Sequence, residues 1–154
     1  MKALRILLVV NDAAPLPEQQ RLINELGEFL QAQVGLLHLI DPGDISPISP
    51  CYDDLIDQLQ RQGYAHLHRI TNCLIREPLA LYLRISRYPD RMIAAVANVF
   101  RADHIVLSAT PPATYADLSL PDLTARLSLL TKVPVMALAP APSQPRFGYP
   151  LCYN

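Results

Sequence analysis

The chain contains 154 residues, which suits one domain with a sizeable hydrophobic core and is too short for two domains of ordinary size. Hydrophobic residues make up 51% and charged residues 18% of the chain, a composition that excludes a disordered protein. The 13 Lys and Arg residues nearly balance the 14 Asp and Glu residues, so we expect no nucleic-acid partner. No apolar run approaches the roughly 20 residues that cross a bilayer, and we expect a cytoplasmic protein with no membrane partner.

The first part of the chain alternates between strand and helix patterns. Residues 4–10 form a nearly unbroken run of Leu, Ile and Val, as expected of a parallel strand that is buried on both faces. Pro17 then opens a segment in which apolar residues recur every three or four positions, which predicts an amphipathic helix up to residue 30. Gly35 precedes a second predicted strand at residues 36–40.

The middle of the chain begins with a loop at residues 41–50, because its prolines fit neither a helix nor a central strand. Helical spacing of apolar residues returns over residues 52–74, although Gly63 weakens the pattern. Residues 79–85 are predicted to form a third strand.

The last part repeats the alternation. Pro89 starts a predicted helix that ends near Phe100, and a strand is expected at residues 105–107. After a second loop with prolines, a short helix that carries Leu123, Leu127 and Leu130 is predicted, followed by a last strand at residues 133–138.

Five strands that alternate with four helices predict an α/β fold of three layers, an open parallel sheet with helices on both faces. In such a sheet, ligands bind outside the carboxyl ends of the strands. The segments after residues 10, 40 and 107 are therefore the places where a small-molecule site is expected.

Three features in this order resemble the universal stress protein family: Asp12 directly after the first strand, the segment ADHIVL at residues 102–107, and the segment VPVMAL at residues 133–138. The resemblance spans residues 2–140. It implies a three-layer Rossmann-like sandwich with a five-stranded sheet in the order 3-2-1-4-5. It also implies a homodimer formed by pairing of the last strands, and a role in stress adaptation or signalling. We accordingly divide the chain into a universal-stress-protein-like domain at residues 1–140 and a tail rich in proline and aromatic residues at residues 141–154.

Many members of that family bind ATP through the pattern Gly-x2-Gly-x9-Gly-(Ser/Thr), which follows the fourth strand. In this sequence the four defining positions of the pattern fall on Ser108, Pro111, Pro121 and Asp122. Proline has no backbone N–H to donate to a phosphate, and the carboxylate of Asp122 repels one. Pro121 and Asp122 also suit the first turn of a helix, where the N-terminal dipole favours negative charge. We therefore expect neither ATP binding of the usual kind nor a bound cofactor.

A nucleotide site without the family's phosphate loop is the alternative, and its candidate residues are Asp12, Ile40, Ser108 and Thr110. The resemblance implies that Asp12 contacts the adenosine moiety and that the backbone of Ile40 contacts the adenine. Alternatively, Asp12 is a turn residue whose carboxylate binds nearby backbone N–H groups, and Ile40 is an ordinary buried strand residue. Ser108 and Thr110 lie near the predicted switch point, but hydroxyls in such loops usually cap the backbone, and no catalytic set accompanies them.

Neither the histidines nor the cysteines predict a metal site. His66 and His68 are two positions apart on a predicted helix and face different ways, and His38 and His104 lie on or beside separate strands. The three cysteines, one of which is Cys152, are far apart and form no Cys-x-x-Cys pair, so reduced structural thiols are expected.

The sequence thus favours a dimeric regulatory or interaction module that is not an enzyme and that contacts a protein partner. The alternative is a nucleotide-binding stress sensor for AMP, adenosine, ATP or a cyclic dinucleotide, which would use Asp12 and the loop at residues 108–122. The aromatic residues of the tail are expected to pack on their own domain, on the dimer mate or on another protein.

Overall fold

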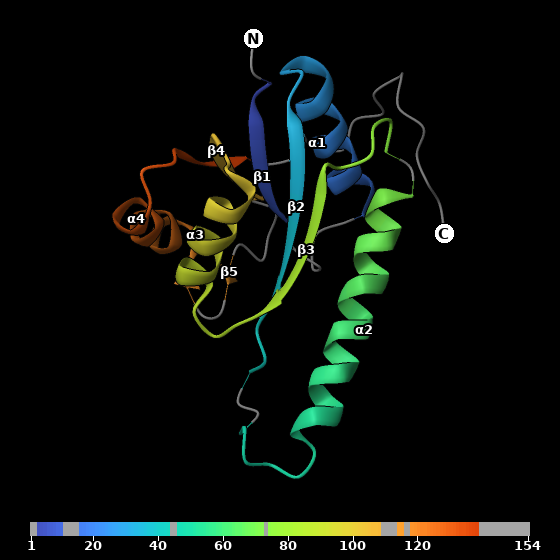
Figure 1. The fold of residues 1–154 in the computed structure, drawn as a ribbon, viewed down its shortest axis with the longest axis vertical. Coiled ribbons are helices and arrows are strands. Elements are labelled where there is room, and N and C mark those ends of the chain that lie inside the picture. Colours follow the sequence, from blue (N-terminus) through green and yellow to red (C-terminus); the bar gives the residue numbers. More distant parts are fainter. Residues whose placement is uncertain are drawn as a thin grey trace.

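The structure, a computed structural model, describes residues 3–10, 16–43, 46–72, 74–108, 114–115 and 118–138. Within these residues, five parallel strands form one sheet in the order β3-β2-β1-β4-β7, which confirms the predicted order 3-2-1-4-5 (Figure 1). The strands are β1 (Arg5–Val10), β2 (Gln33–Ile40), β3 (Ala80–Ile85), β4 (His104–Ser108) and β7 (Val135–Leu138). The tail at residues 141–154 lies outside the described residues.

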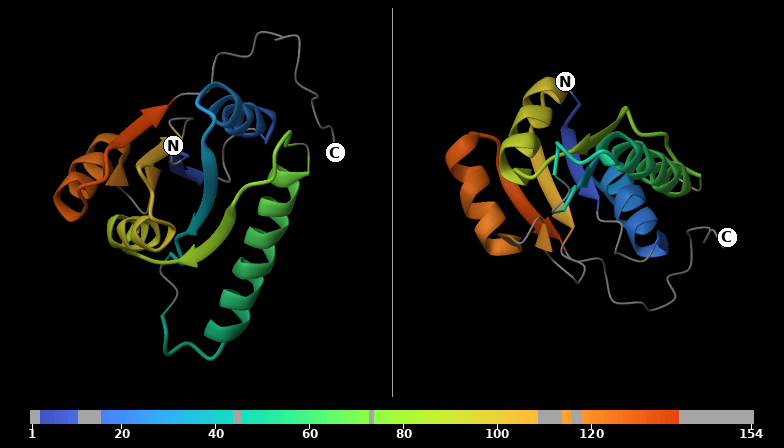
Figure 2. Two further views of the ribbon diagram at one scale, coloured as in Figure 1. Left: turned by 45° about the horizontal axis from the view of Figure 1, so that its top comes forward. Right: turned by 90° about the horizontal axis from the view of Figure 1, so that it is seen from below.

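Helices cover both faces of the sheet, so the predicted three-layer sandwich is confirmed. The helices are α1 (Leu16–Phe29), α2 (Tyr52–Thr71), α3 (Pro89–Phe100) and α4 (Leu120–Leu130). Helices α1 and α2 lie on one face and α3 and α4 on the other, as the view along the sheet in Figure 2 shows. This arrangement follows from the parallel connections, because each one must cross over a face of the sheet.

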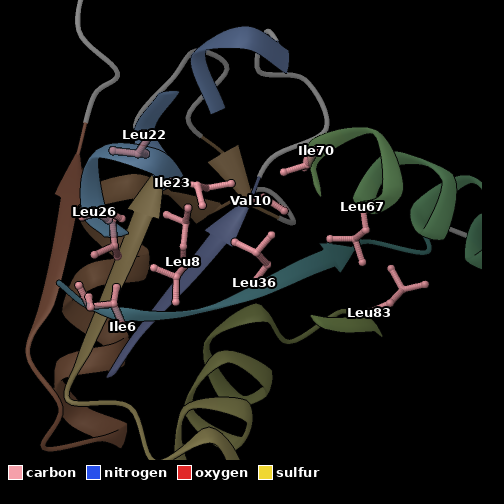
Figure 3. Close-up of a cluster of buried hydrophobic side chains, with 13 residues drawn as sticks. Ile6, Leu8, Val10, Leu22, Ile23, Leu26, Leu36, Leu67, Ile70 and Leu83 are labelled. Atoms are coloured by element: carbon pink, nitrogen blue, oxygen red, sulfur yellow. The ribbon is translucent and has the colours of Figure 1, made fainter. Parts of the chain in front are cut away.

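Two hydrophobic clusters fill the spaces between the layers. Successive side chains of β1 alternate between them: Ile6, Leu8 and Val10 join the cluster under α1 and α2, and Leu7 and Val9 join the one under α3 and α4. Figure 3 shows the first cluster, in which side chains from α1 and α2 point toward the strands. Burial on both faces explains why β1 is apolar at every position from Ile6 onward.

The second strand begins earlier than the sequence indicated. Gly35 was expected to precede the strand, yet it lies inside β2, which begins at Gln33. A Cβ atom built on Gly35 would lie 2.9 Å from the ring of Phe100, so the missing side chain lets α3 approach the sheet closely. Gly35 is therefore a packing residue inside β2 and does not mark the start of the strand.

Other boundaries differ at helix and strand ends. Helix α4 begins at Leu120, one residue before the predicted first-turn residue Pro121, because Ser119 caps it. Helix α2 ends at Thr71 rather than residue 74, and β7 begins at Val135 rather than residue 133.

The loop before α4 also contains two short strands that the sequence analysis did not predict. They are β5 (Thr114–Tyr115) and β6 (Leu118–Ser119), which pair antiparallel. Strands of two residues carry too little periodicity to be recognised from sequence.

The contact between Gly35 and Phe100 yields a prediction about stability. Phe100 is only 1% exposed and belongs to the second cluster, so Gly35→Ala should overpack that cluster and lower the free energy of unfolding by about 1 kcal/mol or more. Urea unfolding followed by circular dichroism measures the change.

Gly27→Ala is the matched control, because nothing lies within 4 Å of a Cβ built there. That helical substitution should leave the protein as stable or up to about 1 kcal/mol more stable. A Gly35→Ala protein as stable as Gly27→Ala would contradict this account of the packing.

Candidate functional site

The predicted site region lies at the carboxyl edge of the sheet, where β1, β2 and β4 end. In the strand register, Val10 pairs with His38 and Val9 pairs with Leu107. The ends of β2 and β4 therefore flank the end of β1 at one edge, as expected for a site at the switch point of an open sheet. Asp12 and Thr110, which were predicted for this site, lie outside the described residues.

Ser108 is the last residue of β4 and only 2% of it is exposed. Strand alternation places it on the same face of the sheet as Val106, which belongs to the cluster under α1 and α2. This hydroxyl therefore lies within the packed end of the sheet, and its predicted role at a nucleotide site stays a prediction.

Ile40 ends β2, and both its side chain and its carbonyl group take part in the fold. The side chain packs against the cluster under α1 and α2, and the carbonyl oxygen accepts the backbone N–H of Ser86 at 3.0 Å. The contact with adenine that the family resemblance implies for this backbone stays a prediction. Its position beside a cavity, described below, keeps that contact open.

The N-terminus of α4 occupies the place where the family pattern has its last glycine and hydroxyl residue. The side-chain oxygen of Ser119 accepts the backbone N–H of Asp122 at 3.3 Å, and Pro121 in the same turn has no N–H. Asp122 lies in this first turn, where its negative charge interacts favourably with the positive end of the helix dipole. The structural reading of Pro121 and Asp122 from the sequence is thereby confirmed.

A cavity of about 430 Å³ opens between α2 and the carboxyl half of β2. The described residues that line it are His38, Ile40, Leu59, Gln62, Gly63, His66 and Arg69. Helix α2 runs alongside β3, and its first turns extend beyond the end of β2 (Figure 1). The cavity thus lies next to the predicted site residue Ile40.

Two histidines form the buried wall of this cavity. His38 is 2% exposed and His66 is 9% exposed, and their ring centroids are 5.1 Å apart with the ring planes inclined by 42°. This pair was not predicted from the sequence, where His66 was compared only with His68, because His38 and His66 come together only when α2 packs on β2. Alternation along β2 and helical spacing along α2 were the signals that could have found it.

Gly63 brings α2 close to the sheet at this point. A Cβ atom built on Gly63 would lie 2.6 Å from Cδ1 of Leu83, 2.7 Å from Cδ1 of Ile40 and 3.3 Å from Cδ2 of His38. The glycine that weakened the helical pattern is therefore a packing residue, and it sets the spacing of the two imidazole rings.

No three potential metal-binding side chains gather anywhere in the described part of the chain. Among the described helices, none is long and apolar enough to cross a membrane.

Comparison with known proteins gives matches at the level of structure alone. No model of a protein family matches the sequence, and no curated protein matches it either. Among solved structures, the chain is similar to hypothetical protein MJ0577, with a TM-score of 0.62 and 14% identity over 88% of this chain and 94% of that one. It is also similar to hypothetical protein PH0823, with a TM-score of 0.61 and 17% identity over 92% and 99% of the two chains.

A third similar structure is the universal stress protein UspA from Lactobacillus plantarum, with a TM-score of 0.58 and 17% identity. The alignment covers 90% of this chain and 98% of that protein, so the likeness extends over nearly the whole fold. The strand order β3-β2-β1-β4-β7 agrees with the order that the sequence resemblance implied. The chain has the fold of the universal stress proteins.

Proposed function

We propose that this chain, which has the universal stress protein fold, is a regulatory module that acts in the cytoplasm through protein contacts. It catalyses no reaction, and it does not bind ATP in the family's usual way. The observation that carries the proposal is the first turn of α4. There Ser119 already accepts the Asp122 N–H, and Pro121 has none to donate.

A triphosphate needs N–H donors and positive charge, and this helix end supplies little of either. Helix N-termini bind phosphates through their free N–H groups together with the helix dipole. Asp122 places a negative charge in that turn, and two like charges about 4 Å apart repel by about 1 kcal/mol in water and by about 4 kcal/mol at an effective dielectric constant of about 20. The replacements therefore disfavour a phosphate chain at this end of the sheet.

The alternative function is a sensor of a nucleoside or a nucleotide with fewer phosphates. The cavity beside Ile40 favours it, because about 430 Å³ falls within the usual volume range of small-molecule sites. Such a ligand would not need the donors that α4 lacks.

Calorimetric and thermal-shift titrations with ATP, AMP and adenosine separate the two functions. A ligand that binds only the folded state raises the apparent stability of the protein. We expect no such response to micromolar ATP, because the α4 N-terminus supplies few N–H donors and carries the negative charge of Asp122. A response to AMP or adenosine, together with no response to ATP, would favour the sensor. Micromolar binding of ATP would overturn the proposal.

The double variant Pro121→Gly with Asp122→Ser is the matched control for this titration. It restores the two family residues at the α4 N-terminus, and it should bind ATP more tightly than the wild-type protein because a donor returns and a negative charge is removed. Equal ATP binding by both proteins would show that these two residues do not control it.

We also propose that the module is a homodimer formed through β7. In the described residues, β7 pairs only with β4, and Met136 on it is 41% exposed. An exposed apolar strand edge is a template for pairing with another chain. The Pro134 carbonyl accepts the N–H of Ile105, so alternation along β7 directs the N–H of Ala137 away from β4.

Ala137→Pro tests the dimer without breaking the internal ladder, because it removes a donor that faces outward. Light scattering at micromolar concentration should give a dimer mass for the wild-type protein and for the control Ala137→Val, and mostly a monomer mass for Ala137→Pro. A wild-type monomer would remove the dimer from the proposal, and a dimeric Ala137→Pro would place the interface elsewhere.

A further inference from the structure

We propose that the cavity between α2 and β2 is a binding site for a small phosphate monoester, held by His38, His66 and Arg69. The proposal does not depend on the regulatory role proposed above, which was argued from the α4 N-terminus. It concerns the same cavity as the alternative sensor, and it names the residues that would hold the phosphate there.

The cavity combines a buried polar wall with a charged rim. His38 and His66 are at least nine-tenths buried, in an interface whose other buried members from α2 and the strands are mainly Leu and Ile. Arg69 and Gln62 line the same cavity from the exposed side of α2. The two imidazole rings and the Arg69 guanidinium group therefore line one cavity, where a ligand that enters it meets all three.

The shape of the site is set by residues that the fold holds in place. The approach of α2 at Gly63 fixes the two rings 5.1 Å apart. The last turn of α2 is fastened to α1, because Gln20 Nε2 donates to the carbonyl oxygens of Arg69 and Ile70 at 2.9 and 3.2 Å. A preorganised donor set binds with a smaller loss of conformational entropy than a mobile one.

The number and type of donors favour phosphate. Arg69, two imidazoles and the Gln62 amide offer more hydrogen bonds than the two oxygens of a carboxylate accept, whereas a phosphate monoester has three terminal oxygens. None of the described residues that line the cavity is acidic, so nothing among them opposes an anion. Ile40 and Leu59 provide an apolar surface for the group that carries the phosphate.

The same helix offers matched control positions. Arg61 is exposed and lines a separate depression on α2 together with Asp54 and Asp57, and His68 is exposed on the helix surface. Arg69→Gln is the test variant and Arg61→Gln its control, because each removes one positive charge from α2. In the same way His66→Gln is the test variant and His68→Gln its control, because each removes one imidazole ring.

Phenyl phosphate and benzoate are the probes, since they share an aromatic ring and differ in the anion. We expect saturable calorimetric binding of phenyl phosphate to the wild-type protein, at least tenfold tighter than benzoate. Arg69→Gln should weaken it roughly tenfold, the loss expected for one charge-assisted hydrogen bond, while Arg61→Gln changes it less than twofold. Inorganic phosphate should compete for the site.

Nuclear magnetic resonance of the wild-type imidazoles gives a readout that needs no variant. Phenyl phosphate should shift the ring signals of His38 and His66 and leave those of His68 unchanged, and His66→Gln should weaken binding more than His68→Gln if thermal melts show both folded. Absence of saturable binding would overturn the proposal. So would equal affinity for benzoate, or an equal effect of Arg69→Gln and Arg61→Gln.

Discussion

The burial of β1 on both faces is the constraint on which the rest of the structure depends. Its residues from Ile6 to Val10 are almost fully enclosed, and its backbone pairs with β2 on one side and β4 on the other. Each of the two hydrophobic clusters includes alternate side chains of this strand. Because a strand enclosed in this way needs helices on both faces, the chain must cross over the sheet in both directions from β1. The carboxyl edge where β1, β2 and β4 end is a consequence of that arrangement.

Features that depend on neighbours in the chain could be predicted from the sequence. The alternation of strands and helices follows from apolar periodicity, and the first turn of α4 follows from Pro121 and Asp122, whose effects on a helix start are local. The sheet order came from the resemblance of short segments to a known family, and the structure agrees with it.

Features that depend on distant parts of the chain could not be predicted in the same way. Gly35 was predicted to precede the strand, and only the contact with Phe100 from α3 shows why a glycine lies inside it. Gly63 weakened the helical pattern, and only the contacts with Ile40 and Leu83 show why it is there. The same limit applies to His38 and His66. Each is unremarkable on its own element, and only the packing of α2 on β2 places their rings together. A polar residue on a buried face is thus the sequence signal to follow, since its partner has to come from another element.

The N-terminus of α4 and the cavity between α2 and β2 differ in the groups that they offer to an anion. At the N-terminus of α4, recognition would have to come from backbone N–H groups, and these are reduced by Pro121 and by the Ser119 cap. Between α2 and β2, donors come from side chains, and the fold positions them through a glycine contact and through Gln20. Side-chain donors tolerate changes in the loop after β4, because they belong to elements on the other side of β1. A chain that has this fold but lacks the glycine pattern can therefore still offer, at its sheet edge, the site for a smaller anion that is proposed above.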